Sequence, residues 1–149
     1  LPAARPADAV RWAVELMVLP DRYSGAHQFA FGDSPELADE LLALVLAGKK
    51  TATCGALRDH EAGEPLPQVG RQDVVLDGRG QPACVIETTA VEIVPFDAVT
   101  ADFAEAEGEG PYDAWREGHI AFFGRNGGWD GQMKLVCERF ALVEVLDRT

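Results

Sequence analysis

The sequence predicts an α+β domain, because segments of strand character are interrupted by amphipathic helical segments without a regular βαβ rhythm. Its 149 residues fit one domain, and a hydrophobic fraction of 47% is enough to bury a single core. The chain contains no internal repeat and no segment with the composition of a linker. We therefore expect one mixed or closed sheet packed against helices.

Two helices are expected in the first third of the chain. Ala7–Leu19 carries a rough apolar stripe at helical spacing. The second helix is better signalled, since Asp33 and the Glu36 that follows it three residues later form a capping box, and Pro35 suits the first turn. Gly48 is well placed as the C-terminal stop of this helix.

From residue 50 onward the pattern changes to strands, with two further helices among them. Asp77-Gly78-Arg79-Gly80 lies between two apolar runs and is a strong hairpin signal. Trp115, His119 and Phe122 share one face of a predicted helix, and we expect them in the core. The expected strands are 51–54, 73–76, 83–94 and 134–145, and the expected helices are 100–107 and 112–123.

Charge and composition restrict the class of ligand. A net charge of −12, with only 13 scattered basic residues, disfavours broad binding to a nucleic-acid backbone. This balance is more typical of a protein that binds a small neutral molecule. No apolar run approaches the roughly 18 residues of a membrane span, so we expect no membrane partner.

The cysteines and histidines indicate neither a disulfide framework nor a metal site. Three widely separated cysteines without a Cys-x-x-Cys pair are typical of a reducing compartment, and we expect a cytoplasmic protein. The N-terminus also lacks the apolar core of a signal peptide. The spacing of these side chains does not match that of metal ligands, so no metal and no cofactor are expected. The residues concerned are Cys54, Cys84, Cys137, His27, His60 and His119.

The run from Gly48 to Thr53 (Gly-Lys-Lys-Thr-Ala-Thr) is the first candidate for chemistry. A phosphate-binding loop is excluded, because Ala43 stands where its first glycine belongs and the run follows a helix instead of opening one. Two interpretations remain. Lys49 and Lys50 could satisfy carbonyls at the helix C-terminus, or Lys50 and Thr53 could supply a catalytic amine and a hydroxyl. The second requires a bend, because residues three apart in a strand point to opposite faces.

An ordered set of motifs resembles the longer bacterial branch of the ASCH family. The resemblance covers Phe31 to Val145 and implies a PUA-like small β-barrel with helices flanking a cleft. It further implies one ASCH domain over residues 1–149, with an N-terminal helical extension (1–30) and a core of barrel and helices (31–146). The motifs are Phe31-Gly32-Asp33, residues 36–40, Gly-x-Lys-x-x-Thr at 48–53, residues 74–78 and Cys137-Glu138-Arg139-Phe140.

The resemblance implies an activity and a catalytic set. Compact relatives hydrolyse the N4-acyl amide of modified cytidine nucleosides with a lysine, a threonine and a glutamate, which fall here on Lys50, Thr53 and Glu107. Glu105 is the competing position for the glutamate. Thr53 would be the nucleophile or orient a water, and Lys50, with a pKa lowered by a dry cleft, would accept its proton. Glu107 would deliver a proton to the leaving group.

Three further residues are expected to bind substrate. Phe31 could stack on a pyrimidine or lie in the core, and Arg139 could line the cleft or form a cross-strand ion pair. Arg58 is the counterpart of an arginine that follows the threonine more closely in compact relatives. Because other relatives bind or cleave RNA, a ribonuclease acting on single-stranded RNA and a non-catalytic RNA- or nucleotide-binding module are the alternatives to an amidohydrolase.

Overall fold

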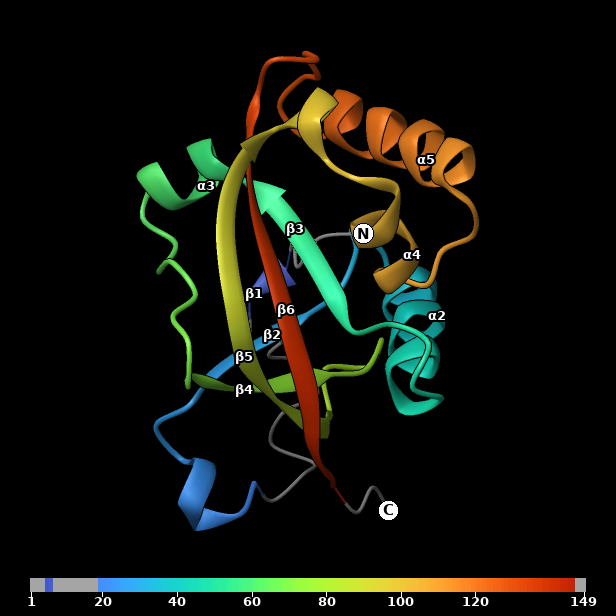
Figure 1. Ribbon diagram of the computed structural model, residues 1–149. Helices are drawn as coiled ribbons and strands as arrows, with labels where there is room; N and C mark the ends of the chain where they lie inside the picture. Colours follow the sequence, from blue (N-terminus) through green and yellow to red (C-terminus); the bar gives the residue numbers. More distant parts are fainter. Residues whose placement is uncertain (1–4, 7–18, 147–149) are drawn as a thin grey trace.

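The computed structural model describes residues 5–6 and 19–146, and these form one six-stranded sheet (Figure 1). The order of the strands across the sheet is β1-β2-β4-β5-β6-β3. The helix expected over Ala7–Leu19 lies, apart from its last residue, outside the described residues. The strands are β1 (Arg5–Pro6), β2 (His27–Ala30), β3 (Ala52–Ala56), β4 (Gln72–Leu76), β5 (Pro82–Pro95) and β6 (Lys134–Val145).

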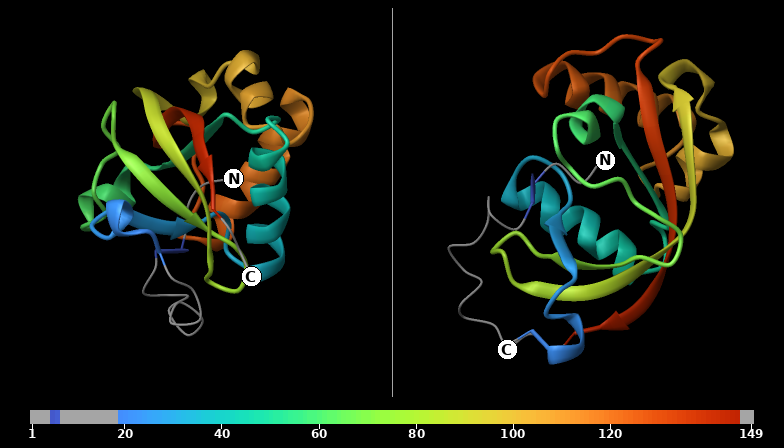
Figure 2. Two further views of the ribbon diagram at one scale, coloured as in Figure 1. Left: turned by 90° about the horizontal axis from the view of Figure 1, so that it is seen from below. Right: turned by 90° about the vertical axis from the view of Figure 1, so that its left-hand side faces the viewer.

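The sheet is strongly curled and forms a half-barrel. β2 pairs with β4 in parallel, and the other four pairings are antiparallel. Figure 2 shows β5 and β6 curving together along the length of the molecule, which gives the sheet its curled shape. In the part of the chain that the structure describes, β1 and β3 are the two edges and do not pair. The expected PUA-like α+β fold is confirmed, with a half-barrel as its sheet.

Residues 19–146 also form four α-helices. Figure 1 shows α2, α4 and α5 together on one side of the long strands, with α3 on the other side. Trp115, His119 and Phe122 of α5 are buried, as the sequence predicts. None of the helices formed by residues 19–146 has the length and apolar character that crossing a bilayer requires. The helices are α2 (Pro35–Leu46), α3 (Leu57–Glu61), α4 (Ala101–Ala106) and α5 (Tyr112–Arg125).

The start of α2 differs by one residue from the sequence prediction. Ser34 is the N-cap, and its hydroxyl accepts a hydrogen bond from the backbone N–H of Leu37 at 3.1 Å. Asp33 forms an ion pair with Arg125 at 2.6 Å instead, a contact between residues far apart in sequence. The predicted stop is correct, since Gly48 has a φ of +76°, a backbone conformation that glycine adopts without strain.

The hairpin between β4 and β5 is confirmed and is fixed to α2. Oδ1 of Asp77 accepts hydrogen bonds from the backbone N–H groups of Arg79 and Gln81, which closes the turn. The N–H of Gly78 donates to Asp39 of α2 at 2.7 Å. The sequence prediction lacks the two-residue strand β1, the short strand β2, which has no alternating pattern, and the single-turn helix α3.

Candidate functional site

Lys50 and Glu107 form a buried ion pair between the end of α2 and the end of α4. Nζ of Lys50 lies 2.9 Å from Oε1 of Glu107, and both side chains are 0% exposed. The same ammonium donates a hydrogen bond to the carbonyl of Ala52 at 2.9 Å and lies 3.6 Å from a carboxylate oxygen of Glu109. Glu105, the competing position for the glutamate, is exposed. The Lys50–Glu107 pair therefore holds the backbone carbonyl of Ala52, the residue before Thr53, through a hydrogen bond from Lys50.

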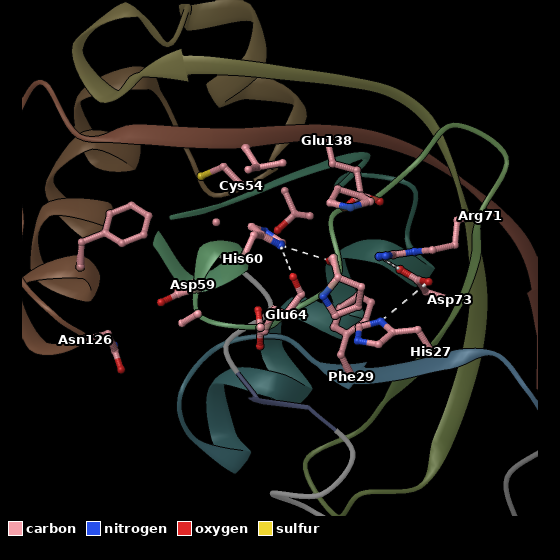
Figure 3. A pocket seen from close by; sticks show the side chains of 18 of the residues that line it. His27, Phe29, Cys54, Asp59, His60, Glu64, Arg71, Asp73, Asn126 and Glu138 are labelled. Carbon is pink, nitrogen blue, oxygen red and sulfur yellow. Dashed lines mark hydrogen bonds and ion pairs between the residues drawn. The ribbon is translucent and has the colours of Figure 1, made fainter. Parts of the chain in front are cut away.

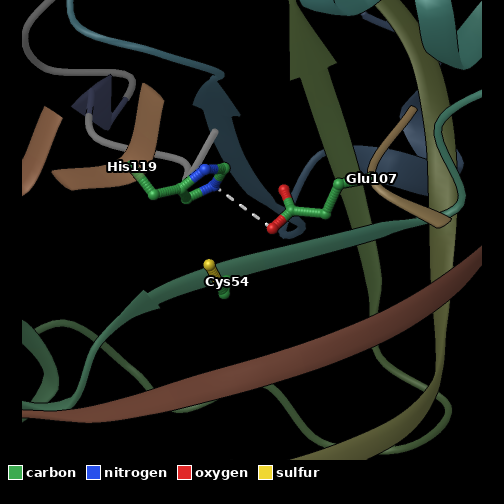
Figure 4. Close-up of side chains that lie close together, drawn as sticks. All are labelled: Cys54, Glu107 and His119. Atoms are coloured by element: carbon green, nitrogen blue, oxygen red, sulfur yellow. Dashed lines mark ion pairs between the residues drawn. The ribbon is translucent and has the colours of Figure 1, made fainter. Parts of the chain in front are cut away.

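The second carboxylate oxygen of Glu107 is held from the side of α5. The indole N–H of Trp115 donates a hydrogen bond to Oε2 at 2.9 Å, and Nε2 of His119 lies 3.3 Å from the same atom (Figure 4). Nδ1 of His119 is 2.8 Å from the carbonyl of Trp115, which can only accept, so Nδ1 carries a hydrogen. Glu107 is therefore fixed on both oxygens.

The environment of the pair favours its charged form. Burial alone would lower the pKa of Lys50, but the negative charges of Glu107 and Glu109 hold that pKa above its ordinary value of 10.5. Burial alone would raise the pKa of Glu107, but the charge of Lys50 holds it well below the ordinary 4.5. Lys50 is an ammonium and Glu107 a carboxylate, which is opposite to the protonation states that the expected proton-transfer roles require.

Cys54 approaches the same carboxylate from β3. Its sulfur, a carboxylate oxygen of Glu107 and a nitrogen of His119 lie within 4.8 Å of one another (Figure 4). These atom types can ligate a metal ion. The fit is poor, however, because burial raises the pKa of the Cys54 thiol well above its usual 9.0 and the Lys50 ammonium already occupies Glu107.

Gly108 allows the end of α4 to approach the Lys50 segment. Its φ is +76°, and a Cβ at this position would lie 2.5 Å from the carbonyl oxygen of Lys49. The N–H of Thr51 donates to the carbonyl of Ala106 at 2.7 Å across the same contact. Glycine at this position therefore places Glu107 beside Lys50.

Gly108→Ala is expected to lower the free energy of unfolding by at least about 1–2 kcal/mol, because the backbone conformation disfavours any Cβ. The steric conflict with Lys49 adds to this cost. Urea denaturation measures the change. Gly118→Ala in α5 is the matched control, since its added methyl group meets no atom within 4 Å beyond the local backbone of the helix, and it should stabilise by about 0.5–1 kcal/mol. Equal effects of the two substitutions would contradict the role given to Gly108.

Thr53 faces a cavity on the other side of this polar cluster. The cavity has a volume of about 790 Å³ and is bounded by β2, β3, β4, β6, α3, the C-terminal end of α5 and the segment 62–67 (Figure 3). Thr53, Cys54 and Gly55 contribute the β3 wall, and Phe29 of β2 contributes an aromatic ring. This volume is in the range of small-molecule sites.

Acidic groups outnumber basic groups around the cavity. Four carboxylates and one guanidinium line it, together with two histidines. A cavity of this charge is a poor site for a polyanion, because phosphate binding requires an excess of cations. The carboxylates are those of Asp59, Glu64, Asp73 and Glu138, the guanidinium is that of Arg71, and the histidines are His27 and His60.

The polar groups at one side of the cavity are largely satisfied by each other. Figure 3 shows Arg71, Asp73 and His27 together, away from Asn126. Arg71 donates to Asp73 at 2.7 Å, and Nδ1 of His27 lies 3.8 Å from the other oxygen of Asp73. The positive charge of Arg71 is therefore already paired with a carboxylate.

Of the six residues predicted for the site, Thr53 alone lines this cavity. Phe31 is 0% exposed and packs edge-on against Phe29, so its ring belongs to the core and Phe29 lies at the cavity instead. Arg58 donates to the carbonyls of Asn126 and Gly128 and lines a separate hollow of about 330 Å³. Arg139 pairs with Asp102 at 2.9 Å on the outer surface.

Sequence reasoning missed the polar side chains that do line the cavity. In the sequence Glu138 is recognised only as a member of the motif Cys137-Glu138-Arg139-Phe140, and no role is assigned to it. The signal that identifies it is the ladder register, in which Thr53 lies directly opposite Glu138. Alternation along β6 then places Glu138 in the cavity and Arg139 on the opposite face.

The fold and the site define a PUA-like α+β domain with a cavity of about 790 Å³ beside a buried Lys–Glu pair. A family model described as the ASCH domain matches residues 27–144, and the chain belongs to the ASCH domain family. A comparison with curated proteins found no match.

Two crystal structures of bacterial proteins are similar to this chain. Protein EF3133 from Enterococcus faecalis V583 is 41% identical, with a TM-score of 0.73 over 78% of this chain and 75% of that one. An ASCH domain from Lactobacillus crispatus JV V101 is 32% identical, with a TM-score of 0.74 over 85% of this chain and 87% of that one. Both similarities extend over most of each chain.

Proposed function

We propose that this protein hydrolyses the N4-acyl amide of acylated cytidine nucleosides. The observation that carries the proposal is a cavity of about 790 Å³ that combines the Thr53 hydroxyl with a predominantly acidic wall. Small-molecule sites fall in the range of about 300–1,000 Å³, and a nucleoside without phosphate brings no negative charge into this wall. Amide hydrolysis also requires a nucleophile at the ligand, and Thr53 supplies one.

Lys50 and Glu107 support Thr53 from behind the cavity wall. Both side chains are sealed from solvent, so they act through the backbone and through their charge. The Lys50 ammonium donates to the carbonyl of Ala52, which belongs to the same peptide group as the N–H of Thr53. Glu107 fixes Lys50 in place and is itself fixed by Trp115. In this proposal Thr53 is the catalytic residue, and Lys50 and Glu107 are positioning residues.

The charge of the cavity favours this activity over the alternatives that act on RNA. Proteins that bind single strands use a positively charged groove with aromatic platforms. Here Phe29 provides an aromatic ring, but the one guanidinium of the cavity wall is paired with Asp73. A phosphodiester would meet four carboxylates in the same wall. The acidic wall thus argues against a ribonuclease and against an RNA-binding module.

Incubation of the purified protein with N4-acetylcytidine and, separately, with labelled single-stranded RNA tests the proposal. We expect cytidine and acetate from the nucleoside and intact RNA in the second reaction, followed by chromatography. A filter-binding measurement with the same RNA should show no complex at 0.15 M salt, where contacts to phosphate are weakened. Cleavage of the RNA with intact N4-acetylcytidine would replace the proposed function with the ribonuclease alternative.

A further inference from the structure

The buried pair of Lys50 and Glu107 does not provide a group that can transfer protons in the proposed reaction. The charge of Glu107 holds Lys50 protonated, and the charge of Lys50 holds Glu107 ionised. Neither side chain reaches the cavity, since each is 0% exposed. A group that exchanges protons with Thr53 and with a leaving amine must touch both. The carrier must therefore line the cavity.

Glu138 is the cavity carboxyl that lies next to Thr53. The two residues are directly opposite in the antiparallel ladder of β3 and β6, and both line the cavity. Cβ atoms of directly opposed residues are about 4.5–5.5 Å apart, which puts a glutamate carboxyl within reach of a threonine hydroxyl. Glu64, another cavity carboxyl, lies instead on the segment that follows α3.

The carboxyl of Glu138 is oriented but not neutralised. The buried hydroxyl of Thr88 in β5 donates a hydrogen bond to its Oε2. Among the residues that the structure describes, no other hydrogen bond to this carboxyl and no ion pair with it occurs. Asp73 differs, because its carboxylate is already taken by Arg71 at 2.7 Å. One oxygen of Glu138 is thus available for proton exchange.

The surroundings of Glu138 favour its protonated form more than water does. Burial raises the pKa of Glu138 above the ordinary 4.5, and the nearby charge of Asp73 acts in the same direction. The Thr88 hydrogen bond and the positive groups Arg71 and His27 oppose this shift without cancelling it. A raised carboxyl pKa brings the group closer to the optimum for general acid–base catalysis.

We propose that Glu138 is the acid–base residue that transfers the proton between the Thr53 hydroxyl and the leaving amine. The assignment rests on the proposed function for its substrate, and on the ladder register for its geometry. It gives the catalytic role expected of Glu107 to a different carboxyl. Glu107 then keeps the role of fixing Lys50.

The steps balance without any further reactant. Oγ of Thr53 bonds to the acyl carbon while Glu138 takes the hydroxyl proton. As the C–N bond breaks, Glu138 returns that proton to N4, which leaves as the amine of cytidine. Water then attacks the Thr53 ester, Glu138 takes one of its protons and delivers it to Oγ, and the carboxylic acid departs. One amide and one water become one acid and one amine.

The test uses an acyl donor that does not depend on the cytidine substrate. Wild-type protein and Glu138→Gln are mixed with 4-nitrophenyl acetate, and mass spectrometry follows acetylation of Thr53 over a range of pH. We expect acetylation of the wild-type protein to fall as the pH drops through the raised pKa of Glu138. Glu138→Gln, which can still accept the Thr88 hydrogen bond, should be slower by about 10²- to 10⁴-fold and lose this pH dependence.

Two further variants separate chemistry from folding and from cavity charge. Glu138→Asp keeps the carboxyl one methylene shorter and should recover part of the rate. Glu64→Gln removes an equal charge from the cavity wall and should retain the pH dependence. Circular dichroism and thermal unfolding confirm that each variant is folded. Equal acetylation of Thr53 in wild type and Glu138→Gln, or none in the wild type, would overturn the assignment.

The failure of the proposed function looks different in the same set of measurements. In that case the wild-type protein acetylates Thr53 from 4-nitrophenyl acetate in a Glu138-dependent manner but leaves N4-acetylcytidine intact. The acid–base assignment then stands, and another acyl substrate of similar size must be sought. Turnover of N4-acetylcytidine at equal rates by wild type and Glu138→Gln has the opposite meaning, since it supports the function and removes Glu138 from it.

Discussion

Thr53→Val is expected to reduce the turnover of N4-acetylcytidine by more than about 10³-fold, because it removes the proposed nucleophile and leaves the rest of the cavity in place. Valine keeps the branched shape of threonine, and the residue is 5% exposed in the cavity wall. The free energy of unfolding should change by no more than about 1.5 kcal/mol, the contribution of a hydrogen bond. Steady-state kinetics and urea denaturation measure the two quantities.

Thr53→Ser is the matched variant for this prediction. Serine keeps the hydroxyl but loses the methyl group that restricts its rotamer, so part of the activity should remain. The valine variant thus lacks the reactive hydroxyl but keeps the packing, whereas the serine variant keeps the hydroxyl but loses part of the packing. A Thr53→Val variant with near wild-type turnover would remove Thr53 from the mechanism and leave the cavity as a binding site only.

Lys50→Met is expected to destabilise the fold by about 3–5 kcal/mol, because it leaves the Glu107 carboxylate buried without its partner. Lys50→Met combined with Glu107→Gln removes both charges and should recover much of this loss, since a neutral pair needs no compensation. Lys49→Ala is the control: this side chain is exposed at the end of α2 and contributes at most about 0.3–1 kcal/mol. Urea denaturation of wild type, Lys50→Met, Glu107→Gln and the double variant gives the coupling energy.

The pair also predicts how stability changes with pH. Because the pKa of Glu107 is lowered in the folded state, its contribution is present above pH 4.5 and is lost as the pH falls through the lowered value. The pKa of Lys50 is raised, so its contribution is present below pH 10.5 and is lost as the pH rises through the raised value. Subtracting the profile of the double variant isolates both losses. Parallel profiles for the two proteins would mean that the pair is not charged in the fold.

Most of the secondary structure could be predicted because its signals are local. The last strand is found at the predicted residues 134–145, and the hairpin at Asp77–Gly80 forms where its turn residues indicate. The short strand β2 could not be predicted, since its four residues show no alternation and it pairs with β4 across more than forty residues of sequence. The N-cap of α2 is Ser34, while the carboxylate of Asp33 forms an ion pair with Arg125, a residue far along the chain.

By itself, the order of motifs in the sequence determined the family, the PUA-like fold and the association of Lys50 with Glu107. Only the tertiary structure decided which side chains face a ligand. The Lys50 side chain is sealed between the ends of α2 and α4, where it pairs with Glu107, whereas Thr53 in β3 lines the cavity. Glu138 lies beside Thr53 because of the register between β3 and β6. This pairing joins segments that are distant in sequence, and no local pattern encodes it.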